Sequence, residues 1–191
     1  NKLFFQKMKT LRTHGIEKNL NPKVKKNVGD WYYEHRELGY NFRLSDIHAS
    51  LGISQLKKLN FFLKQRQKIA NQYNDIFNKI NDIIPLKIKK YNKSSYHLYV
   101  VRLISQKKNF RNNLIKFLKK KKIILNVHYI PIHFHPFYKK FKFDKKLLQN
   151  SEIYFKQAIS LPIYVGLSKK KQIFVAKTII KFMTKNKLTS K

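Results

Sequence analysis

The sequence contains no cysteine, so disulfide bonds, thiolate metal sites and a cysteine nucleophile are all excluded. It also lacks any apolar run that approaches the roughly 20 residues needed to span a bilayer. The first ten residues, NKLFFQKMKT, have no apolar core of signal-peptide length. These absences favour a soluble cytoplasmic protein. The first residue is Asn1 and not methionine, so we expect the chain to begin inside a longer polypeptide or after processing.

Glycine is also scarce. The five glycines are too far apart to form a GxGxxG loop or a P-loop, and the HExxH, EF-hand and GxSxG patterns do not occur. The 191 residues are enough for one ordinary domain or for part of a larger one. Because 42% of them are hydrophobic and 14% are aromatic, a sizeable core can form.

Acidic residues are scarce too: the chain has nine of them and 43 Lys and Arg, which gives a formal net charge of +34. This excess suggests nucleic-acid binding, since neutralisation of phosphates drives affinity for polyanions. However, only six of the basic residues are arginine, the better residue for bidentate phosphate and base contacts. The lysines are spread along the chain, and they accompany many residues whose codons are rich in A and T. A basic nucleic-acid-binding domain is therefore kept only as an alternative function.

One stretch, residues 29–52, differs from the rest of the chain. It holds three of the five glycines, the only tryptophan and four of the nine acidic residues, and no lysine falls between Lys26 and Lys57. We interpret it as a shaped loop, centred on residues 39–43, that leads into a long helix. From residue type alone, Asn41 could lie in an ordinary turn, because asparagine is a common turn former.

Apolar residues at three- and four-residue steps predict several helices. Ser45 or Asp46 can cap the longest, Ser151 a short one and Ser168 the last. The predicted helices cover residues 1–11, 46–80, 110–120 and 151–158, and the segment after Ser168. Aromatic and β-branched runs predict strands at residues 96–104 and 123–129 and an extended piece at 160–163. Residues 17–30 and 130–143 are predicted loops.

These elements predict an α/β chain that contains a small α+β layer domain. We divide it into an interface loop region (1–45), a long interdomain helix (46–80) and a small C-terminal domain (81–191). In the predicted strand 123–129, alternation puts Tyr129 on the apolar face and His128 on the other face, so Tyr129 can be a core residue and His128 a surface residue.

Three histidines, His128, His133 and His135, are close enough in sequence to ligate a metal. No carboxylate follows them before Asp144, and prolines flank two of them. We expect hydrogen bonding in the loop or contact with a substrate, and no metal site.

A set of short motifs extends in order along nearly the whole chain. The motifs are RTHG (12–15), WYYE (31–34), LGYNFRLSDI (38–47), ASLG (49–52), YHLY (96–99), VHYIPIH (127–133), PFY (136–138) and AISLP (158–162). This ordered set resembles the sugar aminotransferases of the DegT/DnrJ/EryC1/StrS family, and in particular the members of the pseudaminic acid pathway. The resemblance implies the C-terminal part of an aspartate-aminotransferase-like, fold type I enzyme that uses pyridoxal 5'-phosphate.

The resemblance also implies roles for individual residues. Asn41 would contact the cofactor phosphate of a partner subunit, in a homodimer whose site is shared across the interface. Arg43 would add a charge-assisted contact to an anion, or else pair with Asp46. His128, Tyr129 and His133 would bind the nucleotide-sugar substrate, because imidazole and phenol groups suit a diphosphate, sugar hydroxyls or a base.

The implied reaction is amination at C4 of a UDP-linked 4-keto-6-deoxy amino sugar, with glutamate as the donor. A sibling aminotransferase of the perosamine type, acting on another nucleotide 4-keto sugar, is the alternative within the family. The family's Schiff-base lysine lies upstream of the RTHG motif, and no lysine of this chain has the sequence context that the family shows around it. We therefore expect a fragment without a catalytic residue of its own, and without activity when alone.

Overall fold

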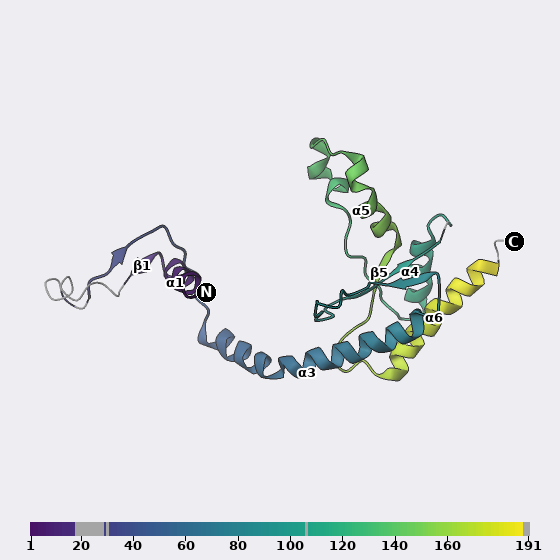
Figure 1. The fold of residues 1–191 in the computed structure, drawn as a ribbon, viewed down its shortest axis with the longest axis horizontal. Helices are drawn as coiled ribbons and strands as arrows, with labels where there is room; N and C mark the ends of the chain where they lie inside the picture. The colour runs from purple at the N-terminus through teal and green to yellow at the C-terminus, as the bar shows by residue number, and fades with distance from the viewer. Residues whose placement is uncertain (18–28, 30, 106, 189–191) are drawn as a thin grey trace. The chain divides into compact units, whose positions relative to one another are not determined.

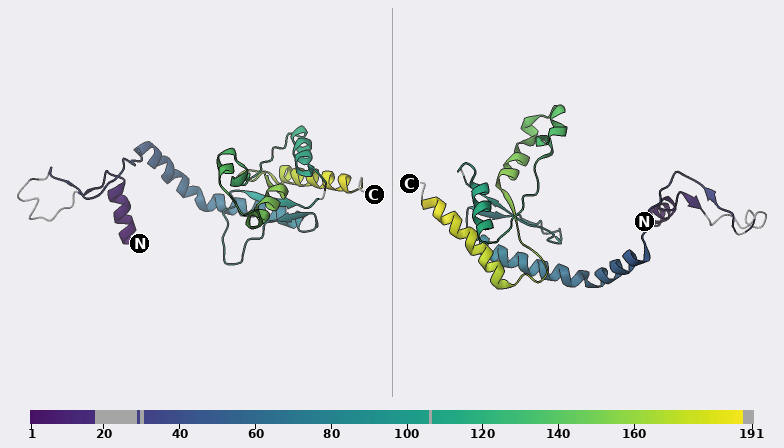
Figure 2. Two further views of the ribbon diagram at one scale, coloured as in Figure 1. Left: turned by 90° about the horizontal axis from the view of Figure 1, so that it is seen from above. Right: turned by 180° about the vertical axis from the view of Figure 1, so that it is seen from behind.

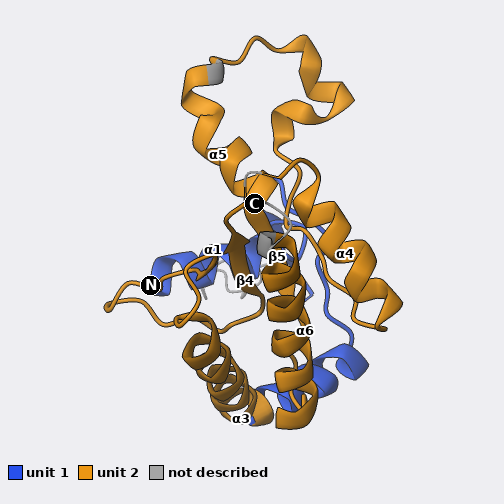
Figure 3. Ribbon diagram, turned by 90° about the vertical axis from the view of Figure 1, so that its right-hand side faces the viewer, with its two compact units in different colours: residues 1–57 blue, residues 58–191 orange. Residues whose placement is uncertain are grey.

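The computed structural model describes residues 1–17, 29, 31–105 and 107–188 (Figure 1). Two compact units divide the chain, residues 1–57 and residues 58–191, and their boundary lies inside α3 (Figure 3). The elements are α1 (Lys2–Leu11), β1 (Ile16–Glu17), β2 (Glu34–His35), α3 (Asp46–Phe77), β3 (Ile83–Pro85), β4 (Tyr99–Leu103), α4 (Phe110–Lys120), η1 (Ile132–Phe134), η2 (Pro136–Lys140), α5 (Lys145–Gln157), β5 (Ala158–Leu161) and α6 (Lys169–Leu188). The division into parts 1–45, 46–80 and 81–191 stays a prediction.

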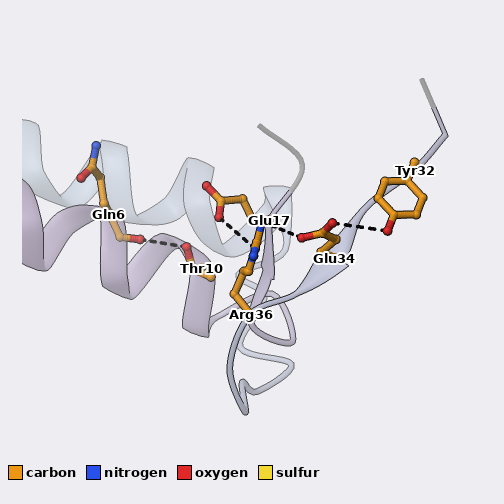
Figure 4. A network of polar contacts seen from close by, with 6 residues as sticks. All are labelled: Gln6, Thr10, Glu17, Tyr32, Glu34 and Arg36. Carbon is orange, nitrogen blue, oxygen red and sulfur yellow. Dashed lines mark hydrogen bonds and ion pairs between the residues drawn. The ribbon is translucent and has the colours of Figure 1, made fainter. Parts of the chain in front are cut away.

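The first unit is built from α1 and a short antiparallel pair, β1 and β2. A polar network links the two strands (Figure 4). Arg36 Nη2 lies 2.6 Å from Glu34 Oε2, and Arg36 Nε lies 3.8 Å from Glu17 Oε2. The Tyr32 hydroxyl donates to Glu34 Oε1 at 3.3 Å. These side chains are partly or largely exposed, so each ion pair adds little to stability. The predicted loop 17–30 lies almost entirely outside the described residues.

Helix α3 begins where the sequence predicts, because the Ser45 hydroxyl accepts from the His48 N–H at 3.4 Å. It ends at Phe77 and not near Ile80. The predicted apolar stripe is buried only near its end, at Ile69, Ala70, Tyr73 and Phe77. In the first half of the helix, the apolar side chains of Ile47, Leu51, Leu56 and Leu59 are exposed.

The second unit is a layer of helices on a three-stranded antiparallel sheet of order β3–β4–β5. Alternate side chains of β4, at Tyr99, Val101 and Leu103, are buried. They form one core with the end of α3, with α4 and with α6, the last two of which lie side by side in Figures 1 and 2. The predicted α+β layer is therefore present, and the prediction of a helix at 110–120 is confirmed.

Two polar side chains tie this core together. Gln172 of α6 is almost completely buried, and its Nε2 donates to the Ile69 carbonyl of α3 at 2.7 Å. Tyr73, also buried, donates its hydroxyl to the Pro162 carbonyl at 3.1 Å. Burial holds the pKa of the Tyr73 phenol well above its usual value.

The predicted strand at residues 123–129 is wrong. Ile123 and Leu125 are buried and Ile124 is exposed, as alternation requires, but the backbone meets β5 only at one bridge between Asn126 and Ser160. Burial alternates here without a ladder of hydrogen bonds. The other predicted strand is shorter than expected: it begins at Tyr99 and not at Tyr96, whose φ of 45° is incompatible with an extended strand.

The predicted helix 151–158 is also corrected. Helix α5 begins at Lys145, because the Asp144 carboxylate accepts from the Lys146 N–H at 2.9 Å and caps the first turn. Ser151 lies within the helix. By contrast, the Ser168 cap of α6 is confirmed, since its hydroxyl accepts from the Lys171 N–H at 3.3 Å.

The loop predicted at residues 130–143 contains η1 and η2. Within the described ranges, no helix has the length and hydropathy needed to cross a membrane. The same residues contain no cluster of three or more histidine and acidic side chains that could hold a metal ion.

Candidate functional site

The first candidate site lies in unit 1, where the RTHG segment and the LGYNFR segment meet. Three hydrogen bonds join the backbones of residues 11–14 and 40–42, together with an antiparallel bridge between Thr13 and Asn41. The bonds are His14 N–H to Tyr40 O at 2.8 Å, Tyr40 N–H to Leu11 O at 2.7 Å and Phe42 N–H to Arg12 O at 3.0 Å. Two motifs that are separate in sequence therefore form one structure.

This contact requires glycine on both sides. A Cβ atom on Gly39 would lie 2.0 Å from the Gly15 nitrogen and 2.4 Å from the His14 carbonyl carbon. A Cβ on Gly15 would lie 1.9 Å from the Glu37 oxygen, and the φ of Gly15 is +69°. The obstructing atoms are backbone atoms, so no side-chain rotation could relieve either clash.

The bridge fixes the backbone of Asn41 and leaves its side chain exposed. The rings of its neighbours Tyr40 and Phe42 stack at 4.9 Å and within 4° of parallel. Because side chains alternate along an extended segment, we expect the Asn41 amide on the opposite side from these rings. Asn41 is therefore part of a bridged, extended segment and not of an isolated turn.

Arg43 is exposed as well. Among the described residues, its guanidinium forms no ion pair with Asp46, the alternative that the sequence allowed. Asp46 instead stands in the first turn of α3, where the helix dipole favours a negative charge. An exposed amide and an exposed guanidinium two residues apart can together donate hydrogen bonds to an anion.

The second candidate site lies in unit 2, beside β5. The Nδ1 atom of half-buried His128 lies 2.7 Å from the hydroxyl oxygen of Ser160, which is buried in β5. Tyr129 is 73% exposed, so a core position for its ring was a wrong alternative. The two rings meet edge to face at 4.6 Å. Ser160 thus fixes one nitrogen of His128, while the phenol of Tyr129 remains accessible.

The third residue of this set, His133, is held differently. In η1, His133 Nε2 lies 3.1 Å from the Glu152 carboxylate of α5, and the ring packs against Phe134 and Phe143. Over the described ranges, no hydrogen bond or ring contact joins His133 to His128 or Tyr129. The structure therefore brings together two of the three predicted substrate-binding residues and places the third on the following 3-10 helix.

Sequence reasoning missed the partners of both histidines. Ser160 lies in the AISLP motif, and the prediction that this segment is extended was the only signal for it. Glu152 lies 19 residues from His133, and neither the spacing nor the composition of the sequence links the two.

Residues 1–180 match the model of the DegT/DnrJ/EryC1/StrS aminotransferase family. The chain is 38% identical over 187 residues to the UDP-4-amino-4,6-dideoxy-N-acetyl-beta-L-altrosamine transaminase of Campylobacter jejuni subsp. jejuni serotype O:2, covering 98% of this chain and 47% of that protein. The chain therefore spans about half the length of the curated relatives it matches.

Solved structures agree with this match. The PMP form of the protein named "Putative sugar aminotransferase Spr1654" from Streptococcus pneumoniae superposes with a TM-score of 0.81 at 30% identity, over 96% of this chain and 46% of that one. PseC of Helicobacter pylori, an aminotransferase involved in the biosynthesis of pseudoaminic acid, superposes with a TM-score of 0.77 at 29% identity, over 95% and 46%. With its motifs in order and its fold matched over nearly its full length, the chain belongs to the DegT/DnrJ/EryC1/StrS aminotransferase family.

Proposed function

We propose that this chain is the C-terminal part of a pyridoxal-phosphate-dependent sugar aminotransferase. The reaction is transfer of an amino group from glutamate to C4 of a UDP-linked 4-keto-6-deoxy amino sugar, in the biosynthesis of pseudaminic acid. The observation that carries the proposal is the backbone contact between the RTHG and LGYNFR segments, which holds Asn41 in an extended segment with its amide exposed. The name of the Campylobacter jejuni relative supports the choice of a UDP-linked sugar, and the description of PseC supports the assignment to pseudaminic acid biosynthesis.

The residues present fit the phosphate end of the cofactor. Pyridoxal phosphate, when bound, supplies the electron sink that transamination requires. The Asn41 amide can donate to a phosphate oxygen without adding charge, and the Arg43 guanidinium can neutralise the dianion. The absence of a Cβ at Gly39 and Gly15 lets the two segments meet, and the bridge between them restrains the backbone of Asn41 before the phosphate binds.

We propose that Asn41 and Arg43 serve the site of a second subunit in a homodimer. The large apolar side chains around them are exposed, including Leu38 at 88% and Phe42 at 68%. Burial of such side chains against a second copy would stabilise a dimer and bring the exposed loop to the partner's cofactor. The lysine that binds the cofactor lies, in this proposal, outside residues 1–191.

On the substrate side, His128, Tyr129 and His133 have the chemistry to hold a nucleotide sugar. Because Nδ1 of His128 is hydrogen-bonded to the Ser160 hydroxyl, the other ring nitrogen, Nε2, can contact a diphosphate or sugar oxygen. The exposed Tyr129 ring can stack on the base or donate its hydroxyl. His133, oriented by Glu152, would close the far end of the site.

A chimera tests this function because it supplies the part of the relative that this chain does not cover. This chain would replace the matching 187-residue part of the Campylobacter jejuni transaminase. We expect glutamate-dependent amination of the UDP-linked 4-keto sugar and a loss of that activity in the Asn41→Ala chimera that excess pyridoxal phosphate partly restores. The matched control is Asn78→Ala, at a surface residue just after α3.

The choice of nucleotide is tested in the same chimera. Preference for the UDP-linked over the GDP-linked 4-keto sugar supports the proposal, and the reverse preference supports a perosamine-type sibling. A folded, dimeric chimera that binds pyridoxal phosphate but aminates neither sugar contradicts the proposal.

A further inference from the structure

A cavity of about 430 Å³ lies within unit 2, between the start of α4 and the end of α5. It is separate from the residues assigned above, none of which lines it. Among the described residues of its lining, the charged side chains are all basic: Lys107, Lys108, Arg111 and Lys156. Leu103, Phe110 and Ile153 supply an apolar wall. A pocket of this size with cationic and apolar sides suits a small anionic metabolite.

Arg111 is the distinctive group in this cavity. Its guanidinium donates to the Phe155 carbonyl and lies over the Phe155 ring, with Cζ 4.6 Å from the ring centroid. Its Nε is buried and has no hydrogen-bond partner among the residues that the structure describes. Burial lowers the pKa of this guanidinium, as expected for a cation partly removed from water. Since the described residues that line the cavity include no carboxylate, a bound anion would offset that desolvation.

The start of α4 adds donors to the same cavity. Asn109, its N-cap, has a left-handed backbone with φ 57°, and its side chain makes no capping hydrogen bond. The first-turn N–H groups of Arg111 and Asn112, both in the cavity lining, therefore lack a side-chain acceptor. Such a helix start, with its positive dipole end, binds phosphate well. Lys107 donates to the Asn186 carbonyl of α6, so it anchors the loop that precedes the helix.

We propose that this cavity binds the phosphoryl group of a small phosphorylated molecule. Arg111 and the first-turn amides of α4 would hold the phosphoryl oxygens, and Lys108 and Lys156 would neutralise the remaining charge. The rest of the ligand would lie against Phe110 and Ile153. The site is independent of the proposed aminotransferase function, because it uses none of the same residues.

The test is a titration of the whole chain at a fixed ionic strength of about 0.15 M, where exposed lysines are screened from one another. Inorganic phosphate and glucose 6-phosphate are added separately, and the backbone amide signals of residues 110–112 are followed by NMR. We expect saturable, one-to-one shifts at these amides. Tighter binding of glucose 6-phosphate would identify an organic phosphomonoester as the ligand, and equal binding would identify inorganic phosphate; both results support the phosphoryl site.

Variants separate this site from general attraction to a basic chain. Arg111→Gln should weaken binding by about tenfold, the loss expected for a charge-assisted contact. If that variant does not fold by circular dichroism, the double variant Lys108→Ala, Lys156→Ala should show a loss of similar size. The matched control is Lys119→Ala, Lys120→Ala, which removes the same charge from exposed positions at the other end of α4 and should change affinity by less than about twofold. Shifts that do not saturate, or an equal loss in the control, would overturn the proposal.

Discussion

Replacement of Gly39 by alanine tests the contact that holds the Asn41 segment. The new Cβ would lie 2.0 Å from the Gly15 nitrogen and 2.8 Å from the Gly15 Cα. Carbon and nitrogen cannot approach so closely, so the two segments must move apart. Separation breaks the hydrogen bonds that link residues 11–14 to residues 40–42.

The magnitude follows from the number of bonds lost. Three backbone hydrogen bonds, at about 0.5–1.5 kcal/mol each, give a local destabilisation of about 1.5–4.5 kcal/mol. The effect should be confined to unit 1, because the core of unit 2 includes neither segment. Gly52→Ala is the matched control: a Cβ there meets nothing within 4 Å, and alanine in a helix should stabilise by about 0.5–1 kcal/mol.

Hydrogen exchange of individual amides provides the measurement. In the unmodified chain, the amides of His14, Tyr40 and Phe42 should exchange more slowly than that of Arg43, and in Gly39→Ala they should lose this protection. Gly52→Ala should retain it. Unchanged protection in Gly39→Ala would refute the requirement for glycine, and with it the argument that this contact fixes the backbone of Asn41.

Three further predictions concern unit 2. Burial raises the pKa of the Tyr73 and Tyr99 phenols, so the folded state holds their protons more tightly than the unfolded state. The free energy of unfolding should therefore fall as the pH rises above 10.0, by up to about 1.4 kcal/mol per pH unit for each tyrosine. Urea titrations of a Tyr99→Phe variant should show a shallower fall. Ser160→Ala should release His128, so that its ring signals in NMR broaden or average between two tautomers, whereas a single unchanged tautomer would mean that the hydroxyl does not orient the ring. Asp144→Ala should remove the cap of α5 and reduce the free energy of unfolding by about 1 kcal/mol, measured by urea denaturation, while Asp144→Asn should retain most of it.

The helices with strong periodicity were predicted well from the sequence. Helix α4 matches its predicted range because Phe110, Leu114 and Leu118 are all buried on one side. Helix α5 was predicted too short, since the apolar residues of its first half are Leu147 and Leu148, which are adjacent and give no helical period. With the periodicity absent there, Ser151 was chosen as the cap in place of Asp144.

The failed strand at residues 123–129 has a different cause. Alternation reports which side chains are buried, and Ile123 and Leu125 are indeed buried. It does not report whether the backbone has a neighbour to pair with, and only Asn126 reaches β5. The exposed apolar residues in the first half of α3 show the same limit, because periodicity identifies an apolar face without identifying what covers it.

The candidate sites could be predicted only as sets of residues. The motifs identified Asn41, Arg43 and the histidines, but the contact between Gly15 and Gly39 joins positions 24 residues apart in sequence and depends on the fold. The pairs His128–Ser160 and His133–Glu152 likewise join separate elements. No local pattern in the sequence encodes such pairings, because they depend on where the fold places β5 and α5.

The buried amide of Gln172 has a consequence for how α3 and α6 recognise each other. Hydrophobic contacts tolerate a shift of one helix along the other, because one methyl group can replace another. A hydrogen bond to the Ile69 carbonyl does not tolerate such a shift, since displacement by one turn would leave a donor without an acceptor in an apolar interior. Gln172 therefore penalises every alternative alignment of the two helices, and it selects one arrangement out of several that would bury similar apolar area.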